Sequence, residues 1–130
     1  MNSTLPTNAE LAILGVLWGQ GPATVRQVHD ALQDARGRPS AYTTTLKLLQ
    51  IMLAKHLVSR DESSRTHVYR AALDRQEVEG RLVGDLADRL FGGSTGRLAL
   101  RALDERPASH DELRDMRRLL DRLEGKATFD

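Results

Sequence analysis

The chain has 130 residues and a net charge of +1, and 40% of its residues are hydrophobic but only 4% aromatic. This length suits one compact domain, or a small domain with an oligomerisation appendage, with a core of Leu, Val and Ala. The absence of cysteine excludes disulfides, thiolate metal sites and cysteine nucleophiles, and it suits a reducing cytosol. The longest apolar stretch near the N-terminus, residues 11–18, is too short to span a bilayer, so we expect a soluble, cytoplasmic protein without membrane insertion.

Charge is divided unevenly along the chain. Residues 1–73 carry 8 Lys and Arg against 5 Asp and Glu, a net charge of +3, whereas residues 74–130 carry 11 against 13, a net charge of −2. A basic first half and a mildly acidic second half favour an anionic partner for the first half only.

Three helices are predicted in the first half. Apolar residues recur at helical spacing within residues 9–18, 25–33 and 41–55, and a polar loop with Gly and Pro at 34–39 separates the last two segments. The expected N-cap residues precede these helices in the order Thr7–Asn8, Thr24 and Ser40.

A β-hairpin follows the third helix. Residues 57–61 and 66–71 are short runs containing Val, Thr and Tyr, and the polar tip 62–65 separates them. Three helices and a hairpin within about 70 residues are the order of a winged helix-turn-helix, in which the third helix reads DNA and the hairpin is the wing. The predicted fold class is therefore mostly α with a small β wing, followed by a helical dimerisation arm.

The second half is predicted to be helical throughout. Helices are expected from Asp74 to about Phe91, from Ser94 to about Leu103, and onward from a capping box at Ser109. Three helices with one apolar side each cannot bury those sides among themselves, so we expect a homodimer. The predicted dimerisation residues are Leu82, Leu86, Leu90, Phe91, Leu98, Leu113, Met116 and Leu120. The expected domains are a DNA-binding domain at 1–72, a dimerisation domain at 73–124 and a flexible tail at 125–130.

The third helix carries side chains suited to DNA. Threonine hydroxyls reach phosphates, threonine methyls contact thymine methyls, and lysine binds guanine or phosphate. Taken alone, such a helix is more often an ordinary solvated face; two preceding helices and a basic hairpin move the balance toward DNA. For Arg60, pairing with Asp61 or Glu62 and DNA contact are equally open, whereas Arg65 at the tip favours DNA. The predicted DNA-binding residues are Thr24, Ser40, Tyr42, Thr43, Thr44, Lys47 and Arg65.

No catalytic or metal-binding pattern is apparent. The four histidines lack metal-ligand spacing, and we find no carboxylate pair, Ser/His/Asp order or phosphate-binding glycine loop, so we expect no enzyme, metal or cofactor. His56 follows the third helix where Gly or Asn is usual, which predicts a strained C-cap position. The lone Trp18 is interpreted as a core anchor.

Several segments resemble the BlaI/MecI penicillinase-repressor family. They lie at residues 5–18, 21–29, 41–46, 49–50, 67–69 and 90–94, and the resemblance extends from about Leu5 to Leu123, with Trp18 and the Ala-Tyr-Thr-Thr segment as its most specific parts. The resemblance implies a winged helix, a three-helix dimerisation arm, and repression of resistance genes, commonly a β-lactamase, from a dyad-symmetric operator. It also implies a membrane-bound sensor protease whose action leads to cleavage of the repressor.

The chain departs from this family at three places. Copper-responsive relatives carry a C-terminal cysteine cluster, which is absent here. Relatives under β-lactam control have Asn-Phe at the cleavage point, whereas the candidate cleavage region here reads Leu100, Arg101 and Ala102. Ile51 stands where the family often has Arg, which implies one phosphate contact fewer.

These observations predict a dimeric repressor that binds double-stranded operator DNA and blocks polymerase sterically. Its two reader helices are expected to enter successive major grooves, and loss of the arm would relieve repression. The alternatives are a winged helix used as a protein-interaction module, or a regulator that responds to a different signal.

Overall fold

The computed structural model describes residues 5–36 and 40–125, and it divides the chain into two compact units, Met1–Asp85 and Leu86–Asp130. The division falls within a helix, later than the predicted boundary at 72/73, which stays a prediction. All of the predicted tail except Gly125 lies outside the described residues. The elements, in order, are α1 (Asn8–Gln20), β1 (Ala23–Thr24), α2 (Val25–Arg36), α3 (Tyr42–Ala54), β2 (Val58–Asp61), β3 (Val68–Ala71), α4 (Arg75–Leu90), α5 (Thr95–Glu105) and α6 (His110–Glu124).

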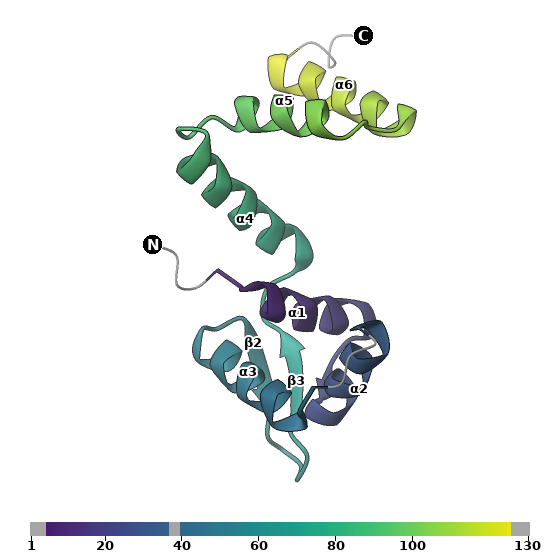
Figure 1. Cartoon of the computed structure of the whole chain (residues 1–130), viewed down its shortest axis with the longest axis vertical. Helices are drawn as coiled ribbons and strands as arrows, with labels where there is room; N and C mark the ends of the chain where they lie inside the picture. Colours follow the sequence, from purple (N-terminus) through teal and green to yellow (C-terminus); the bar gives the residue numbers. More distant parts are fainter. Residues whose placement is uncertain (1–4, 37–39, 126–130) are drawn as a thin grey trace. The chain divides into compact units, whose positions relative to one another are not determined.

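The first unit is a winged helix, as the sequence predicted. Helices α1, α2 and α3 pack around a three-stranded antiparallel sheet of order β1-β3-β2 (Figure 1). The hairpin β2–β3 forms in the expected place, with Val58 opposite Ala71 and Asp61 opposite Val68. The two-residue strand β1, which was not predicted, pairs with the other edge of β3. Strand β3 is therefore central, and its Tyr69 is 1% exposed.

The core of this unit is built mainly from aliphatic side chains, together with Tyr69 of β3. Its fully buried members include Ile13 and Leu14 of α1, Val28 of α2, and Leu49 and Met52 of α3. Val78, near the start of α4, joins the same cluster, so the beginning of α4 belongs to the first unit. Trp18 packs against this cluster, and its Nε1 donates to the carbonyl of Leu73 at 2.9 Å, which agrees with its interpretation as a core anchor.

Two of the three predicted N-caps in this unit are present. The Thr7 hydroxyl accepts from the Glu10 amide at 3.2 Å, and the Glu10 carboxylate accepts from the Thr7 amide at 2.9 Å, which completes a capping box. Thr24 accepts from the Gln27 amide at 3.2 Å in the same manner. Helix α2 continues to Arg36, past the predicted end at residue 33, and residues 37–39 lie outside the described part of the chain.

The prediction that Ser40 caps α3 is wrong. The N-cap is Ala41, which has no side-chain hydrogen bond to the helix, while the Ser40 hydroxyl donates to the Gln33 amide oxygen at 3.0 Å. The serine lies one residue too early, so its hydroxyl bonds to α2 instead. The first turn of α3 therefore begins without a side-chain acceptor.

The end of α3 confirms the expectation for His56. This residue has φ of 64° and is the one non-glycine residue in the described chain with a positive φ. The amide of Leu57 donates to the Met52 carbonyl at 2.9 Å, which satisfies a terminal carbonyl of the helix. A β-carbon in this region costs about 1–2 kcal/mol, so His56 stores local strain.

The second unit contains the end of α4 with α5 and α6. Gly92 and Gly93, with φ of 60° and 86°, terminate α4 as predicted, and the Gly93 amide donates to the Ala87 carbonyl at 2.9 Å. Ser94 caps α5 by accepting from the Arg97 amide at 3.1 Å. Ser109 and Glu112 form the predicted capping box of α6. Local signals therefore placed the end of α4 and the starts of α5 and α6 correctly, whereas α5 continues to Glu105, past its predicted end at about Leu103.

Candidate nucleic-acid interface

Helix α3 has one buried and one exposed side. Thr45, Leu49 and Met52 are buried in the core. The opposite side, termed here the reading face, consists of the exposed residues Thr43, Thr44, Lys47, Gln50 and Ile51. At 100° per residue these five positions fall on one side of the helix. The three predicted DNA contacts on this helix after Tyr42 therefore lie together and face solvent.

A shallow hollow lies on the reading face. Its volume is about 280 Å³, and its walls are Thr43, Thr44, Lys47, Leu48 and Ile51. Hydroxyl groups, an ammonium group and aliphatic carbons therefore share one small surface. This combination can bond to phosphate or a base edge and can also cover an apolar group.

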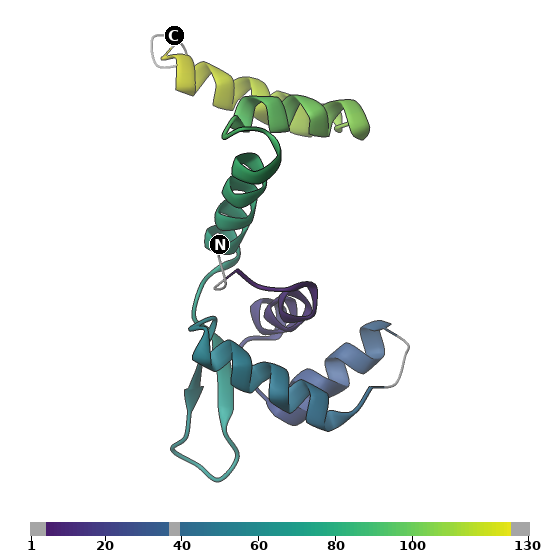
Figure 2. The same ribbon diagram turned by 60° about the vertical axis from the view of Figure 1, so that its left-hand side comes forward.

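A second cavity lies where the start of α2, α3 and the hairpin meet. It measures about 390 Å³, and Thr24, Tyr42 and Arg65 are among the residues that line it. The predicted contacts thus form two groups, one on the reading face of α3 and one around the cavity beside the hairpin, while Ser40 lines neither cavity. Figure 2 shows the hairpin extending beyond the sheet beside α3.

Tyr42 is held by residues of α2 that sequence reasoning missed. The guanidinium of Arg26 lies 4.3 Å from the centre of the Tyr42 ring, and the His29 ring meets it edge-on at 5.7 Å between ring centres. His29 Nδ1 is 3.0 Å from the hydroxyl of Thr45, and both side chains are buried. The position of Arg26 in the first turn of the preceding helix was the available signal. Arg26 brings a second cation to the N-terminal end of α3.

Two arginines of the hairpin, Arg60 and Arg65, differ in whether they are paired. Arg60 donates through Nε to Glu62 Oε2 at 2.8 Å and through Nη1 to the Tyr69 hydroxyl at 3.3 Å. The hydrogen bond to Tyr69, followed by that to Glu62, raises the pKa of Arg60 above its ordinary value. Pairing was one of the two interpretations left open for Arg60. Arg65 is exposed and forms no ion pair with any residue that the structure describes.

The carboxylates of the hairpin are held in their ionised forms. The hydrogen bond from Arg60 lowers the pKa of Glu62 below its ordinary value. The backbone amide of Ser63 donates to Asp61 at 2.9 Å and lowers the pKa of that carboxyl in the same direction. Glu62 therefore compensates the charge of Arg60, and Arg65 is left as the uncompensated cation of the tip.

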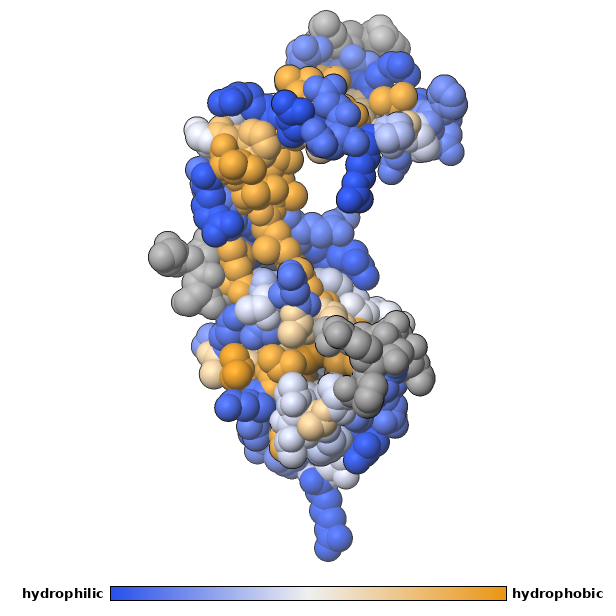
Figure 3. Space-filling view, viewed as in Figure 1, coloured by the Kyte–Doolittle hydropathy of each residue, from blue (hydrophilic) through white to orange (hydrophobic). Residues whose placement is uncertain are grey.

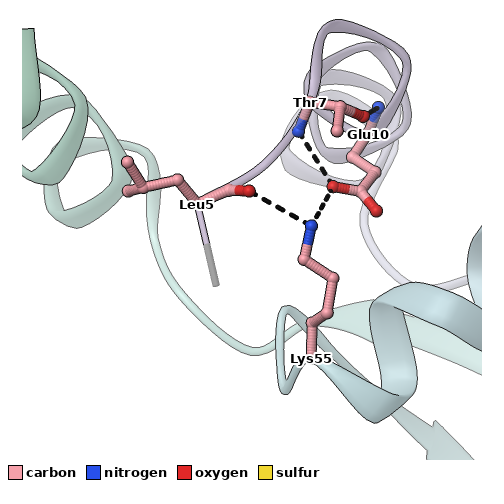
Figure 4. A network of polar contacts seen from close by, with 4 residues as sticks. All are labelled: Leu5, Thr7, Glu10 and Lys55. Carbon is pink, nitrogen blue, oxygen red and sulfur yellow. Dashed lines mark hydrogen bonds and ion pairs between the residues drawn. The ribbon is translucent and has the colours of Figure 1, made fainter. Parts of the chain in front are cut away.

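A polar network fixes α3 against α1 (Figure 4). Lys55, at the end of α3, places Nζ 2.7 Å from Glu10 Oε1 and donates to the Leu5 carbonyl at 3.1 Å. The Glu10 side chain is only 3% exposed and that of Lys55 19%. The same carboxylate oxygen accepts from the Thr7 amide. This buried pair, which nothing in the local sequence indicated, holds the reading face at a defined angle to the rest of the unit.

The second unit leaves much of its apolar surface uncovered. Of the predicted dimerisation residues, Leu86, Leu90 and Leu120 are 41%, 68% and 56% exposed, and Phe91, Leu98, Leu113 and Met116 are half-buried. The remaining one, Leu82, lies in the first unit, where it packs against the core cluster. Figure 3 shows hydrophobic residues along α4 and on the two helices that follow. This unit has further exposed apolar side chains that are not among the predicted dimerisation residues, namely Leu100, Leu103, Leu119 and Leu123.

The candidate cleavage region lies in the middle of α5. Leu100, Arg101 and Ala102 are all exposed, and Arg101 Nη1 lies 3.1 Å from Glu105 Oε2 one turn later. This pair is exposed and of the i,i+4 type, so it contributes only about 0.3–0.5 kcal/mol. Within the described residues, no group of three or more His, Cys, Asp or Glu side chains could hold a metal ion. No helix among them has the length and apolar character needed to cross a membrane.

A family model described as penicillinase repressor matches residues 6–122. The chain belongs to the penicillinase repressor family. Two curated relatives, each called transcriptional regulator BlaI, come from Mycobacterium tuberculosis strains CDC 1551 / Oshkosh and ATCC 25618 / H37Rv. Each is 41% identical over 117 residues, which cover 88% of this chain and 82% of the relative. The resemblance noted from the sequence is thus confirmed, and the chain is a DNA-binding transcriptional repressor of this family and not an enzyme.

Proposed function

We propose that two copies of the chain bind a dyad-symmetric operator together and block transcription from it. Each copy inserts α3 into a major groove, so that Thr43, Thr44 and Lys47 meet base edges and phosphates. The observation that carries this proposal is the reading face, an exposed side of a core-anchored helix that bears hydroxyls and an ammonium group without an ion-pair partner among the described residues. The two half-sites then lie about one helical turn of DNA apart.

The residues beside the hairpin position the protein on the DNA backbone. Arg65 approaches the minor groove or a phosphate next to the half-site, and Thr24, Arg26 and Tyr42 face the phosphates at the start of α3. The N-terminus of α3 carries a partial positive charge and lacks a side-chain cap, which favours a phosphate at that place. Ser40 stays a predicted contact, although its hydroxyl is engaged with Gln33.

The second unit is the part of the chain through which the two copies dimerise in this proposal. Its exposed leucines form an apolar surface of the kind that marks a protein interface, and a self-complementary surface on each copy produces the two-fold symmetry that a dyad operator requires. Linking two half-site readers raises operator affinity by about 10²–10⁴ over one reader alone. The controlled genes on this proposal are a β-lactamase or related antibiotic-resistance genes.

Repression ends when the second unit is cut. A membrane-bound sensor protease is the proposed partner, and the candidate site is the segment from Leu100 to Ala102, whose side chains are exposed. A protease needs an extended chain, so this part of α5 must unfold locally before cleavage. Removal of α6 with part of α5 leaves monomers that make half the contacts with the operator.

The test is fluorescence anisotropy with the full-length chain, using the chain's own promoter DNA and a scrambled duplex over a range of salt concentrations. We expect preference for the promoter, two protomers per duplex and a steep loss of affinity with salt. Lys47→Ala should weaken binding and reduce the salt slope by about 1 if Lys47 meets a phosphate, while Thr44→Ala should cost about 1–3 kcal/mol if it meets a base. Equal binding of both duplexes that is insensitive to salt would indicate a protein-interaction module instead.

A further inference from the structure

Ile51 is an unexpected apolar residue at the C-terminal end of the reading face. Its side chain is 41% exposed on α3, between the exposed Lys47 and the end of the helix. It belongs neither to the core cluster nor to the half-buried hydrophobic residues packed against that cluster. The fold of the first unit therefore gains little from an isoleucine at this position.

The surroundings of Ile51 restrict what it can contact. With Leu48 it forms the apolar wall of the hollow of about 280 Å³, whose other walls are Thr43, Thr44 and Lys47. An isoleucine has no donor for guanine or phosphate oxygens. In the major groove, the one apolar group that a base pair presents is the C5-methyl group of thymine. The adjacent ammonium group of Lys47 supplies the charge that attracts a nucleic acid to this surface.

We propose that Ile51, together with Leu48, receives the methyl group of one thymine in each operator half-site and so specifies a T·A pair there. A cytosine amino group or a guanine or adenine acceptor placed against the same wall loses hydrogen bonds to water without replacement. Ile51 is thus a specificity-determining residue, whereas Lys47 supplies affinity. The inference rests on the proposed function, because it requires α3 to lie in the major groove.

The experiment removes the methyl group and nothing else. Duplexes of about 30 base pairs are selected from a random pool by the full-length chain, and each thymine is then replaced in turn by uracil, which keeps base pairing intact. Burial of one methyl group is worth about 0.8 kcal/mol, which corresponds to about fourfold in affinity. We expect this fourfold loss at one thymine per half-site with the unaltered chain, and no loss at that thymine with Ile51→Ala.

Lys47→Ala is the matched control on the same face. It should weaken binding to every duplex yet keep the fourfold uracil penalty. Circular dichroism during thermal unfolding checks that both variants fold, and each should have the same helical content as the unaltered chain. If the unaltered chain selects no duplex, the proposed function fails and the inference fails with it. If it selects one, and Ile51→Ala shows the same uracil penalties as the unaltered chain, the inference alone is overturned.

Discussion

The two compact units of the chain differ in how they use their apolar residues. In the first unit, Leu49 and Ile13 are fully buried, and a closed core holds three helices against a sheet. In the second, Leu90 is 68% exposed and Leu123 75%, although both units consist largely of helices. Helix signals are present in both units, although α3 lacks a side-chain cap, and the main difference between the units is burial. The first unit buries its apolar residues within a single chain, whereas the second leaves several leucines exposed, as the proposed dimer requires.

The largest effect is expected from a charge in the second unit. Leu120→Asp places a carboxylate on the exposed apolar side of α6, where burial against a second copy would desolvate it. We expect loss of the dimer and a fall in operator affinity of about 100-fold, because paired reading is lost. Sedimentation and anisotropy measure the two effects. Arg117→Gln, at an exposed polar position of the same helix, is the control and should change neither.

Truncation of a core side chain in the first unit should lower the stability of the fold rather than disrupt the dimer. Leu49 is 0% exposed, so Leu49→Ala should lower the free energy of unfolding by about 2–5 kcal/mol. Urea denaturation measures this loss. Ile51→Ala, two residues later on the exposed side of α3, should cost much less, and equal losses for both variants would contradict the assignment of the core.

The buried Lys55–Glu10 pair should respond to removal of its cation. Lys55→Met leaves a carboxylate that is 3% exposed without its ion-pair partner, which we expect to cost about 2 kcal/mol, less than for a fully buried pair because Lys55 reaches solvent. Adding Glu10→Gln should recover part of the loss. Arg81→Met breaks the exposed pair with Glu77 at 3.2 Å and should cost about 0.3–0.5 kcal/mol. If urea denaturation gives similar losses in the free energy of unfolding for Lys55→Met and Arg81→Met, the claim that the Lys55–Glu10 pair contributes more than an exposed pair is wrong.

The smallest expected effect is an increase in stability on replacement of His56. His56 has φ of 64°, where glycine avoids the clash of a β-carbon. His56→Gly should raise the free energy of unfolding by about 1 kcal/mol, since relief of strain exceeds the added freedom of the unfolded chain. Ala54→Gly, two residues earlier within α3, should instead lower it by about 0.5–1 kcal/mol. Destabilisation by both changes would show that His56 is not strained.

Sequence reasoning succeeded where the cause of a structure is local. Helix starts at Thr7, Thr24 and Ser109 follow from side chains three residues apart, and the left-handed residue after α3 follows from the position where the helix must end. The order of three helices and a hairpin then restricted the fold to a winged helix. The exposed side of α3 followed from its periodicity, which placed Thr43 and Lys47 together.

It failed where the cause lies elsewhere in the chain. Strand β1 has two residues and forms only because β3 offers a free edge, so it has no periodicity of its own. Lys55 and Glu10 are 45 positions apart in the sequence. Ser40 has the chemistry of a cap but finds Gln33 as its acceptor. The contacts of Tyr42 with Arg26 and His29 likewise require the packing of α2 on α3.

The contrast between the two units is tested most directly by sedimentation equilibrium of the full-length chain from nanomolar to high micromolar concentration, alone and with promoter DNA. We expect a mass of twice the 14.5 kDa of one chain in the micromolar range, and two protomers on each duplex. A mass of one chain at every concentration, with one protomer per duplex, would contradict the proposal that a second copy covers the exposed leucines of the second unit.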